Sequence, residues 1–186
     1  MSLLGVVLNG GQSSRMGVSK GDLRLGDETL IERMVRLLEP ACDEVVVSVA
    51  RADESSPWKQ IPDTHTNVGP LAGLIAVRDF AQASGFDTIF VTSCDLFGFQ
   101  TDWVSTLPQA TSAFFDDRWQ PMVSKWMTAD LESLEPKNVG LWRVLETLDA
   151  RRVQPPATWT DAFSINTPHD YERAKQCLLN HPERYR

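Results

Sequence analysis

The chain has 186 residues, of which 42% are apolar and 23% charged, so it is long enough for one sizeable hydrophobic core and too apolar for disorder. Its net charge of -7, with 18 scattered Lys and Arg residues, disfavours a nucleic-acid partner but leaves small phosphorylated ligands open, because a few local cations and backbone amides are enough to bind them. Three widely spaced cysteines, Cys42, Cys94 and Cys177, predict neither a disulfide framework nor a zinc site and favour a reducing, cytoplasmic location.

Nothing in the sequence predicts a membrane segment or an export signal. The first residues, MSLLGVVLNGG, lack the basic start and the long apolar run of a signal peptide, and no later stretch approaches about 18 apolar residues. No repeat, low-complexity tract or linker marks a boundary between domains. We therefore expect residues 1–186 to form one cytoplasmic domain that binds no membrane.

The first half of the chain alternates between expected strands and helices. Residues 3–8 are a continuous aliphatic run, which is typical of a strand buried on both faces of a parallel sheet. Thr29 and Glu32 stand at capping-box spacing at the start of an amphipathic helix. The next expected elements are a strand at 44–50, a helix from Pro70 that ends before Gly85, a strand at 87–95 and a short helix at 102–107.

The second half has a different pattern, because two expected strands follow one another closely. SAFFDD at 112–117 and QPMVSKW at 120–126 favour an antiparallel pair. The remaining expected elements are helices at 128–134 and 139–148, and a last helix with Asn166 or Thr167 as N-cap and Pro168 in its first turn. The predicted fold is α/β: a single-domain, Rossmann-like three-layer α/β/α sandwich with a mostly parallel, mixed sheet.

The first expected strand leads into GGQSSRMGVSK, a glycine-rich loop at residues 10–20. It is not a Walker A loop, because the glycine after Gly11 is Gly17, one position too late, and Val18 follows. It is not a dinucleotide fingerprint either, because Gly10, Gly11 and Gly17 lack the Gly-x-Gly-x-x-Gly spacing. Neither common phosphate motif accounts for this loop.

The loop still has the composition of a phosphate site. Gly10 and Gly11 permit close approach of the backbone to a ligand at the carboxyl end of a strand. Arg15 and Lys20 carry charges that oppose a phosphate, and Gly17 allows a turn between them. The loop alone leaves a second interpretation open, a flexible surface turn with two solvated basic residues.

LNGGQSSRMGVSK, residues 8–20, closely resembles the signature LAGGxSxRMGxxK of a group of nucleotidyltransferases. Within this group the chain is most similar to the molybdenum cofactor guanylyltransferases. GPLAG at 69–73, TSCD ending at Asp95 and INTPHDYERA from Ile165 follow in the family's order, so the resemblance covers nearly the whole chain. It implies the fold of the nucleotide-diphospho-sugar transferases.

The resemblance also implies a reaction, the Mg²⁺-dependent transfer of GMP from GTP to the terminal phosphate of molybdopterin or the molybdenum cofactor, with release of pyrophosphate. It implies transient contacts with other cofactor-biosynthesis proteins and with molybdoenzyme chaperones. The chain has Gly10-Gly11, as in the LAGG of the guanylyltransferases, where the related cytidylyltransferases have LAAG. The resemblance therefore implies guanine as the base. Three alternatives remain: a CTP:molybdopterin cytidylyltransferase, a sugar-phosphate nucleotidyltransferase, and a non-catalytic nucleotide-binding module of the same fold.

By the same resemblance, three residues are expected to act on the phosphates. Asp95 matches the aspartate that holds Mg²⁺, and Lys20 and Arg15 match cations that stabilise the triphosphate and the departing pyrophosphate. Asp95 has a second interpretation as the cap of the next helix. The reaction itself requires no general base, because a phosphate nucleophile is already ionised near neutral pH.

The residues expected to bind the nucleotide or the acceptor are Leu8, Asn9, Gly10, Gly11, Lys20, Asp63, Gly69, Pro70, Leu71, Asp95 and Asn166. Other interpretations remain for several of them. Asp63 alone would be an ordinary solvated loop carboxylate, and Asn166 would be explained almost as well by helix capping. The small residues Ala72 and Gly73 of GPLAG fit tight packing of a helix on a sheet as well as a place beside a purine ring.

The chain departs from the family pattern at two places. Asn9 stands where alanine is usual, which would allow an added polar contact. Leu96 and Phe97 follow Asp95 where a small residue, Thr or Met is usually followed by Pro. The second departure removes a rigid turn beside the expected metal ligand and puts the geometry of the site in question.

Overall fold

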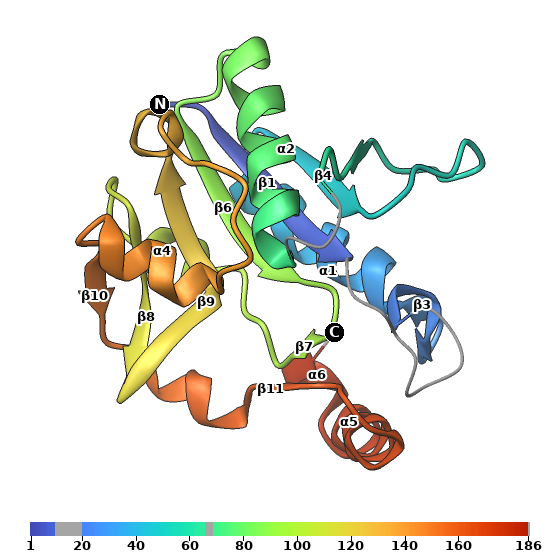
Figure 1. The fold of residues 1–186 in the computed structure, drawn as a ribbon. Coiled ribbons are helices and arrows are strands. Elements are labelled where there is room, and N and C mark those ends of the chain that lie inside the picture. Colours follow the sequence, from blue (N-terminus) through green and yellow to red (C-terminus); the bar gives the residue numbers. More distant parts are fainter. Residues whose placement is uncertain (10–19, 66–68, 186) are drawn as a thin grey trace.

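The computed structural model describes residues 1–9, 20–65 and 69–185. Its centre is a seven-stranded sheet with the order β10-β8-β9-β6-β1-β4-β5 (Figure 1). The strands are β1 (Leu3–Asn9), β4 (Glu44–Val49), β5 (Gln60–Pro62), β6 (Thr88–Ser93), β8 (Ser112–Asp116), β9 (Arg118–Met127) and β10 (Arg151–Val153). Only β9 runs against the others within this sheet, so the sheet is mixed and mostly parallel, as predicted.

Helices and short strands connect and flank this sheet. The helices are α1 (Leu30–Leu38), α2 (Pro70–Ser84), α3 (Trp103–Thr106), α4 (Leu141–Thr147), α5 (Pro168–Asn180) and α6 (Pro182–Tyr185). The 3₁₀ helices are η1 (Lys20–Asp22), η2 (Glu39–Ala41), η3 (Thr128–Leu131) and η4 (Ala157–Asp161). Two small antiparallel sheets pair β2 (Arg24–Leu25) with β3 (Glu28–Thr29) and β7 (Leu96–Phe97) with β11 (Phe163–Ser164).

Local signals in the sequence placed the ends of the longer helices correctly. The Thr29 hydroxyl accepts a hydrogen bond from the Glu32 N–H at 3.2 Å, and the Glu32 carboxylate accepts one from the Thr29 N–H at 2.6 Å. At the end of α2, Gly85 adopts a left-handed conformation with φ of 77°, which glycine allows without a steric penalty. The helix expected at 128–134 is instead the 3₁₀ helix η3, because Glu132 and Leu134 donate to carbonyls only three residues back.

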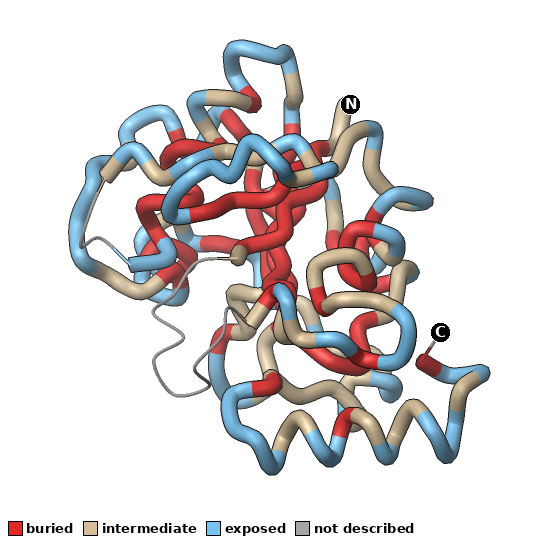
Figure 2. The backbone as a smooth tube through the Cα atoms, turned by 90° about the vertical axis from the view of Figure 1, so that its right-hand side faces the viewer, coloured by how far each residue is buried: buried red, intermediate tan, exposed pale blue. Residues whose placement is uncertain are grey.

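Helices cover both faces of the sheet, which gives the three expected layers. α2 and α4 lie on the face turned to the viewer in Figure 1, and α1 lies behind it. Along β1, Leu4, Val6 and Leu8 pack into the core on the α2 side, whereas Val7 packs into the core on the α1 side. Figure 2 shows buried segments of the chain running through the centre of the molecule. Burial on both faces explains why β1 reads as an uninterrupted apolar run.

The described helices are also informative about membranes. None of them combines the length and the apolar character that crossing a bilayer requires.

Candidate active site

The carboxyl ends of β1 and β6 meet at one edge of the sheet. The two strands are parallel, with Leu8 opposite Ser93, and the Cys94 N–H donates to the Leu8 carbonyl at 3.2 Å. Asp95 therefore leaves β6 next to the end of β1. Helical connections leave β1 toward β4 and enter β6 from β5, so this edge is the point at which the order of the strands reverses, where open α/β sheets bind ligands.

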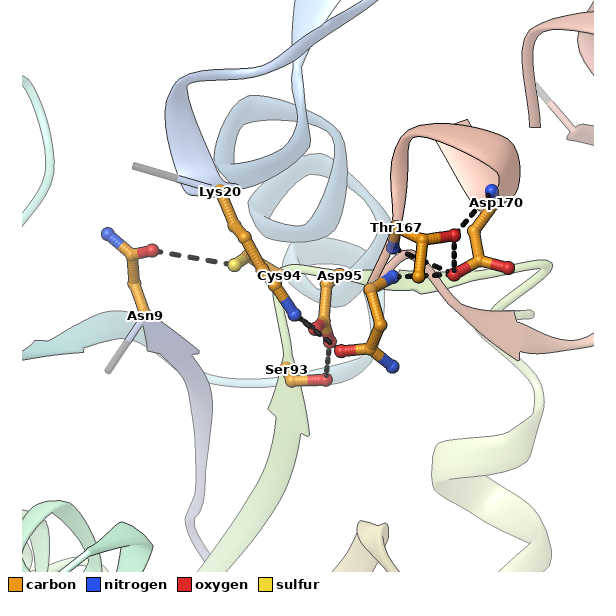
Figure 3. Close-up of polar contacts among 8 residues, drawn as sticks. Asn9, Lys20, Ser93, Cys94, Asp95, Thr167 and Asp170 are labelled. Atoms are coloured by element: carbon orange, nitrogen blue, oxygen red, sulfur yellow. Dashed lines mark hydrogen bonds and ion pairs between the residues drawn. The ribbon is translucent and has the colours of Figure 1, made fainter. Parts of the chain in front are cut away.

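A cation and two oxygen-bearing side chains converge at this edge (Figure 3). The Lys20 ammonium lies 2.8 Å from Oδ2 of Asp95 and 2.6 Å from Oδ1 of Asn166. The Ser93 hydroxyl donates to the other carboxylate oxygen of Asp95 at 2.7 Å. Asp95 makes none of the capping contacts of α3, the next helix, so its interpretation as a helix cap is wrong. The structure instead brings together three of the predicted site residues.

Asn166 reaches Asp95 because the chain returns beside it as a strand. β11 pairs antiparallel with β7, with Ser164 opposite Leu96, and the Ile165 N–H donates to the Asp95 carbonyl at 2.8 Å. The departure from the family pattern after Asp95 thus has a structural explanation. Leu96 and Phe97 form β7, and pairing of β7 with β11 holds the backbone beside Asp95 where a proline would otherwise stiffen it.

A neighbouring residue caps α5 and leaves the Asn166 side chain available to the site. Thr167 is the N-cap: its hydroxyl accepts from the Asp170 N–H at 3.1 Å, and the Asp170 carboxylate accepts from the Thr167 N–H at 2.8 Å and from the Asn166 N–H at 3.0 Å. Hydrogen bonds from the Thr167 side chain and then from the Asn166 N–H hold the pKa of Asp170 below its usual value. The capping box therefore orients the Asn166 backbone, while the Asn166 amide contacts Lys20.

The side chains at this edge fit Mg²⁺ bound together with phosphates. Asp95, Asn166 and Ser93 supply a carboxylate, an amide carbonyl and a hydroxyl, all oxygen donors of the kind Mg²⁺ prefers, and two of them already hold the cationic group of Lys20. Within residues 1–9, 20–65 and 69–185, no three His, Cys, Asp or Glu side chains form a metal cluster. Mg²⁺ sites with one or two protein carboxylates usually take further ligands from substrate phosphates and water.

Asp63 lies at a different position along the same sheet edge. It follows β5, and its N–H donates to the Val49 carbonyl at 2.8 Å. Its carboxylate lies on the α2 side, close to Gly73: a Cβ built on Gly73 would stand 3.4 Å from Oδ1 of Asp63 and 3.4 Å from Cδ2 of Leu8. Burial raises the pKa of Asp63 above its usual value. Asp63 is thus a half-buried carboxylate that costs free energy to ionise, rather than a freely solvated one.

GPLAG forms the start of α2, and its residues divide between the surface and the core. Gly69 has a φ of 67° and is exposed, as is Pro70, the first residue of the helix. The side chain of Leu71 is only 1% exposed and belongs to the core. A Cβ on Gly73 would stand 2.5 Å from the Ser48 hydroxyl, so packing of helix against sheet is sufficient to explain this glycine. Gly69 and Pro70 remain the parts of the motif that are open to a ligand.

Asn9 lies beside the ion pair and contacts the residue before Asp95. The Cys94 thiol donates to Oδ1 of Asn9 at 3.5 Å, as Figure 3 shows. Burial, followed by the charge of Asp95, raises the pKa of Cys94 to about 12, so this thiol stays protonated near neutral pH and remains a donor. Cys94 is therefore a buried packing residue, and Asn9 makes its polar contact within the protein.

Comparison with known proteins establishes the family. The model of the MobA-like NTP transferase domain matches residues 5–153. The chain belongs to this family. A molybdenum cofactor guanylyltransferase of Rhizobium leguminosarum is 31% identical, with 95% of this chain and 93% of that protein covered, and one of Xanthomonas euvesicatoria is 32% identical, with 91% and 92% covered. A probable molybdenum cofactor guanylyltransferase of Opitutus terrae is 40% identical over 112 residues, which span 59% of this chain and 55% of that relative.

Solved structures agree with the fold of this MobA-like protein. Molybdopterin-guanine dinucleotide biosynthesis protein A from Archaeoglobus fulgidus superposes with a TM-score of 0.72 at 20% identity and covers 96% of this chain and 99% of its own. A 2-C-methyl-D-erythritol 4-phosphate cytidylyltransferase from Thermus thermophilus superposes with a TM-score of 0.58 at 17% identity, with coverage of 96% and 98%. These likenesses confirm the predicted nucleotidyltransferase fold.

The residues predicted from the sequence and those found at this MobA-like site differ in two ways. Gly10, Gly11, Arg15 and Gly17 lie outside the described residues, so their expected roles stay predictions. Conversely, the sequence analysis did not identify two residues of the site. Ser93 donates to the Asp95 carboxylate, and Asp170 accepts from the Asn166 N–H. The T-x-x-D spacing of Thr167 and Asp170 was a legible capping-box signal, whereas a serine two residues before an aspartate is not distinctive.

Proposed function

We propose that this MobA-like chain is a molybdenum cofactor guanylyltransferase, which transfers GMP from GTP to the terminal phosphate of molybdopterin or the molybdenum cofactor. The observation that carries the proposal is the contact of Lys20 with both Asp95 and Asn166, at the carboxyl ends of β1 and β6. It places a phosphate-binding cation beside oxygens suited to Mg²⁺ in a chain whose similar relatives include named molybdenum cofactor guanylyltransferases.

The proposed reaction is a phosphoryl-centred substitution. A terminal phosphate oxygen of the acceptor attacks the α-phosphorus of GTP; a new P–O–P link forms, the bond between the α-phosphorus and its bridging oxygen to the β-phosphorus breaks, and pyrophosphate leaves. The attacking oxygen is already ionised, so the described site needs no histidine or serine as a base. Positioning and neutralisation of phosphate charge are then the main tasks of the protein.

The site residues divide these tasks. Asp95 and Asn166 would hold Mg²⁺ together with the phosphates, and the bound ion would neutralise charge on the triphosphate. Lys20 contacts the phosphates and the departing pyrophosphate, with Arg15 as a second cation and the backbone of Gly10 and Gly11 as the cradle. Ser93 keeps the Asp95 carboxylate oriented through its hydrogen bond.

The base and ribose are assigned to the α2 side of the sheet edge. Asp63 lies there with Leu8, and the exposed Gly69 and Pro70 begin α2 close by in the sequence. Guanine is preferred over cytosine because the similar relatives are named guanylyltransferases and because the sequence Gly10-Gly11 lacks the added methyl group of LAAG, which would crowd a purine. Contacts with other cofactor-biosynthesis proteins and with molybdoenzyme chaperones belong to the same proposal.

One assay tests the activity directly. Purified protein is incubated with Mg²⁺, molybdopterin and one of GTP, CTP or UTP, and pyrophosphate release is measured. We expect release with GTP, at least about tenfold less with CTP, and none without the acceptor, because one lost base contact is worth about 1.4 kcal/mol or more. Faster release with CTP, or release only with a sugar phosphate as acceptor, would select the corresponding alternative.

Ligand-induced stabilisation separates an enzyme from a binding module. GTP with Mg²⁺ should raise the melting temperature, because a ligand of the folded state stabilises it. Stabilisation by GTP without any pyrophosphate release in the complete assay would indicate a non-catalytic nucleotide-binding protein.

A further inference from the structure

The Asn9 side chain contacts Cys94 and packs against Gly21, next to the proposed site. Gly21 follows Lys20 in η1, Cys94 precedes Asp95 at the end of β6, and Asn9 ends β1 between them. The contacts of Lys20 with Asp95 and Asn166 described above do not involve these three residues. Their place in the chain nevertheless puts each Asn9 contact one residue away from Lys20 or Asp95.

Gly21 is required by space rather than by backbone conformation. A Cβ built there would stand 2.6 Å from Oδ1 of Asn9, 2.5 Å from Cδ1 of Ile31 and 2.7 Å from Cγ1 of Ile31, all shorter than real Cβ contacts. Its φ does not lie in the left-handed range, and the residue is buried. The turn that carries Lys20 therefore rests directly against the Asn9 amide and the Ile31 side chain.

The same oxygen of Asn9 lies close to the residue after Lys20 and to the residue before Asp95. Oδ1 accepts from the Cys94 thiol at 3.5 Å and, together with Ile31, fills the space beside Gly21. The backbone of Asn9 is held in the sheet opposite Val49. The Asn9 amide is thus a spacer fixed to the central strand, with the Lys20 turn on one side and the strand end that carries Asp95 on the other.

The turn that carries Lys20 is hydrogen-bonded to the start of α1. The Leu23 N–H donates to the Lys20 carbonyl at 3.1 Å, and the Leu30 N–H donates to the Leu23 carbonyl at 2.9 Å. These bonds fix the turn to the start of α1, and the Lys20 side chain pairs with Asp95 just beyond the end of β6. The Asn9 side chain, which contacts Cys94 and packs against Gly21, adds a connection through the central strand.

We propose that Asn9 is a positioning residue, whose side-chain amide sets the separation between Lys20 and Asp95. The kinetic part of this inference rests on the proposed function, because it assigns both residues to the phosphates. Its structural part does not, because the Lys20–Asp95 ion pair is a contact within the chain itself. Asn9 itself makes no contact with the reacting atoms in this proposal.

Kinetics of Asn9→Ala are the first test. We expect kcat for GMP transfer to fall about fivefold or more while KM for GTP changes less than about twofold, because a small misplacement of catalytic groups lowers the rate more than ground-state binding. Ile31→Val is the matched control: it removes Cδ1, the other close neighbour of Gly21, and leaves the amide in place. It should lower stability and leave kcat within about twofold.

Chemical labelling provides a readout that does not depend on the activity. The protein is treated briefly with acetic anhydride, and acetylation of Lys20 is quantified by mass spectrometry relative to Lys137, whose side chain is 68% exposed. In Asn9→Ala the Lys20 amine should react about threefold faster or more than in the wild type, because its turn opens more readily. The Ile31→Val control should show no such increase.

A double variant tests whether Asn9 and Gly21 act as one unit. Gly21→Ala should lower kcat because the new methyl group displaces the Asn9 amide. If the contact is the cause, Asn9→Ala combined with Gly21→Ala should be no worse than the more severe single variant, whereas independent effects would multiply. Multiplying effects, or unchanged kcat and unchanged Lys20 labelling in Asn9→Ala, would overturn the proposal. A wild-type protein without transferase activity would overturn the proposed function instead, and the labelling result would still decide the positioning role.

Discussion

The ammonium group of Lys20 lies 2.8 Å from the carboxylate of Asp95, although 75 positions separate the two residues in the sequence. Their side chains are 23% and 15% exposed, so the pair is shielded from water more than a surface ion pair is. In the proposed mechanism the Asp95 oxygens would hold Mg²⁺ and Lys20 would bind the phosphates, so both ligands would compete with this contact. Binding of the nucleotide and exchange of the Lys20 partner are therefore coupled in the proposed mechanism.

Replacing Asp95 by asparagine tests the proposed metal ligand with little change of shape. We expect kcat/KM for GTP to fall more than about a hundredfold, because loss of even an indirect partner of a metal site costs about 10–100-fold. The circular dichroism spectrum should be unchanged. Asp102→Asn is the control, since Asp102 makes no side-chain capping bond at α3 and should retain activity. Full activity of Asp95→Asn would remove Asp95 from the metal site.

Replacing Lys20 by methionine should have opposite effects on two measurements. The kcat/KM for GTP should fall about 10–150-fold, because a hydrogen bond to a charged group is worth about 1.5–3 kcal/mol. The affinity of the nucleotide-free protein for Mg²⁺, measured by calorimetry, should rise, because no ammonium competes for Asp95. Lys59→Met, which removes an exposed ion pair with Glu44, should change neither quantity. A Lys20→Met variant with unchanged kcat/KM would contradict the assignment.

Alanine variants of Thr167 and Asn166 should distinguish a role in helix capping from a role in the reaction. Thr167→Ala removes the N-cap of α5 and should cost about 0.5–2 kcal/mol of stability in urea denaturation. Asn166→Ala leaves the cap in place, so it should cost less stability but lower kcat/KM for GTP by removing an oxygen that now holds Lys20. If Asn166→Ala destabilises the protein as much as Thr167→Ala and leaves kcat/KM unchanged, Asn166 has only a structural role.

Asp63 should affect stability and function in opposite directions. Burial raises its pKa in the folded protein, so the folded state binds a proton more readily than the unfolded state does. The contribution of Asp63 to the free energy of unfolding therefore falls as the pH rises from its pKa in the unfolded state through its pKa in the folded state. At neutral pH the full destabilisation is present. Asp63→Asn should raise the melting temperature at pH 7, with a gain that shrinks toward zero in acid, while the variant binds GTP more weakly.

Asp53 provides a control of opposite sign for this measurement. A hydrogen bond from the Ser55 N–H lowers the pKa of Asp53 below its ordinary value. Its stabilisation is present above the unfolded pKa and is lost as pH falls through the folded one. Asp53→Asn should therefore lower the melting temperature at pH 7. The same sign for both variants would show that burial does not govern the ionisation of Asp63.

Gly73 should be essential for packing only while Ser48 is present. Gly73→Ala places a Cβ 2.5 Å from the Ser48 hydroxyl and should cost about 1–3 kcal/mol, as overpacked sites do. In a Ser48→Ala background the next neighbours of that Cβ stand at 3.4 Å, an ordinary contact distance. There the same change should be neutral or stabilising by about 0.5–1 kcal/mol, because alanine favours a helix over glycine. Equal costs in both backgrounds would contradict this explanation.

The elements that depend on local spacing could be predicted from the sequence by itself. The capping box of Thr29 and Glu32, the start of α2 at Pro70 and its end before Gly85 all depend on residues within a few positions of one another. The buried strand β1 could be predicted because both of its faces are apolar. The glycine-rich loop and Asp95 indicated phosphate chemistry because these residue types suit it.

The distances that make these residues a site were decided by the tertiary structure. Asn166 lies beside Lys20 because β11 returns to pair with β7, and no local signal in the sequence specifies that pairing. The same holds for Gly21, whose lack of a side chain is explained only when Asn9 and Ile31 are seen to fill its space. Such contacts join segments far apart in the chain, so they depend on the order of strands in the sheet, whereas sequence patterns report mainly on near neighbours.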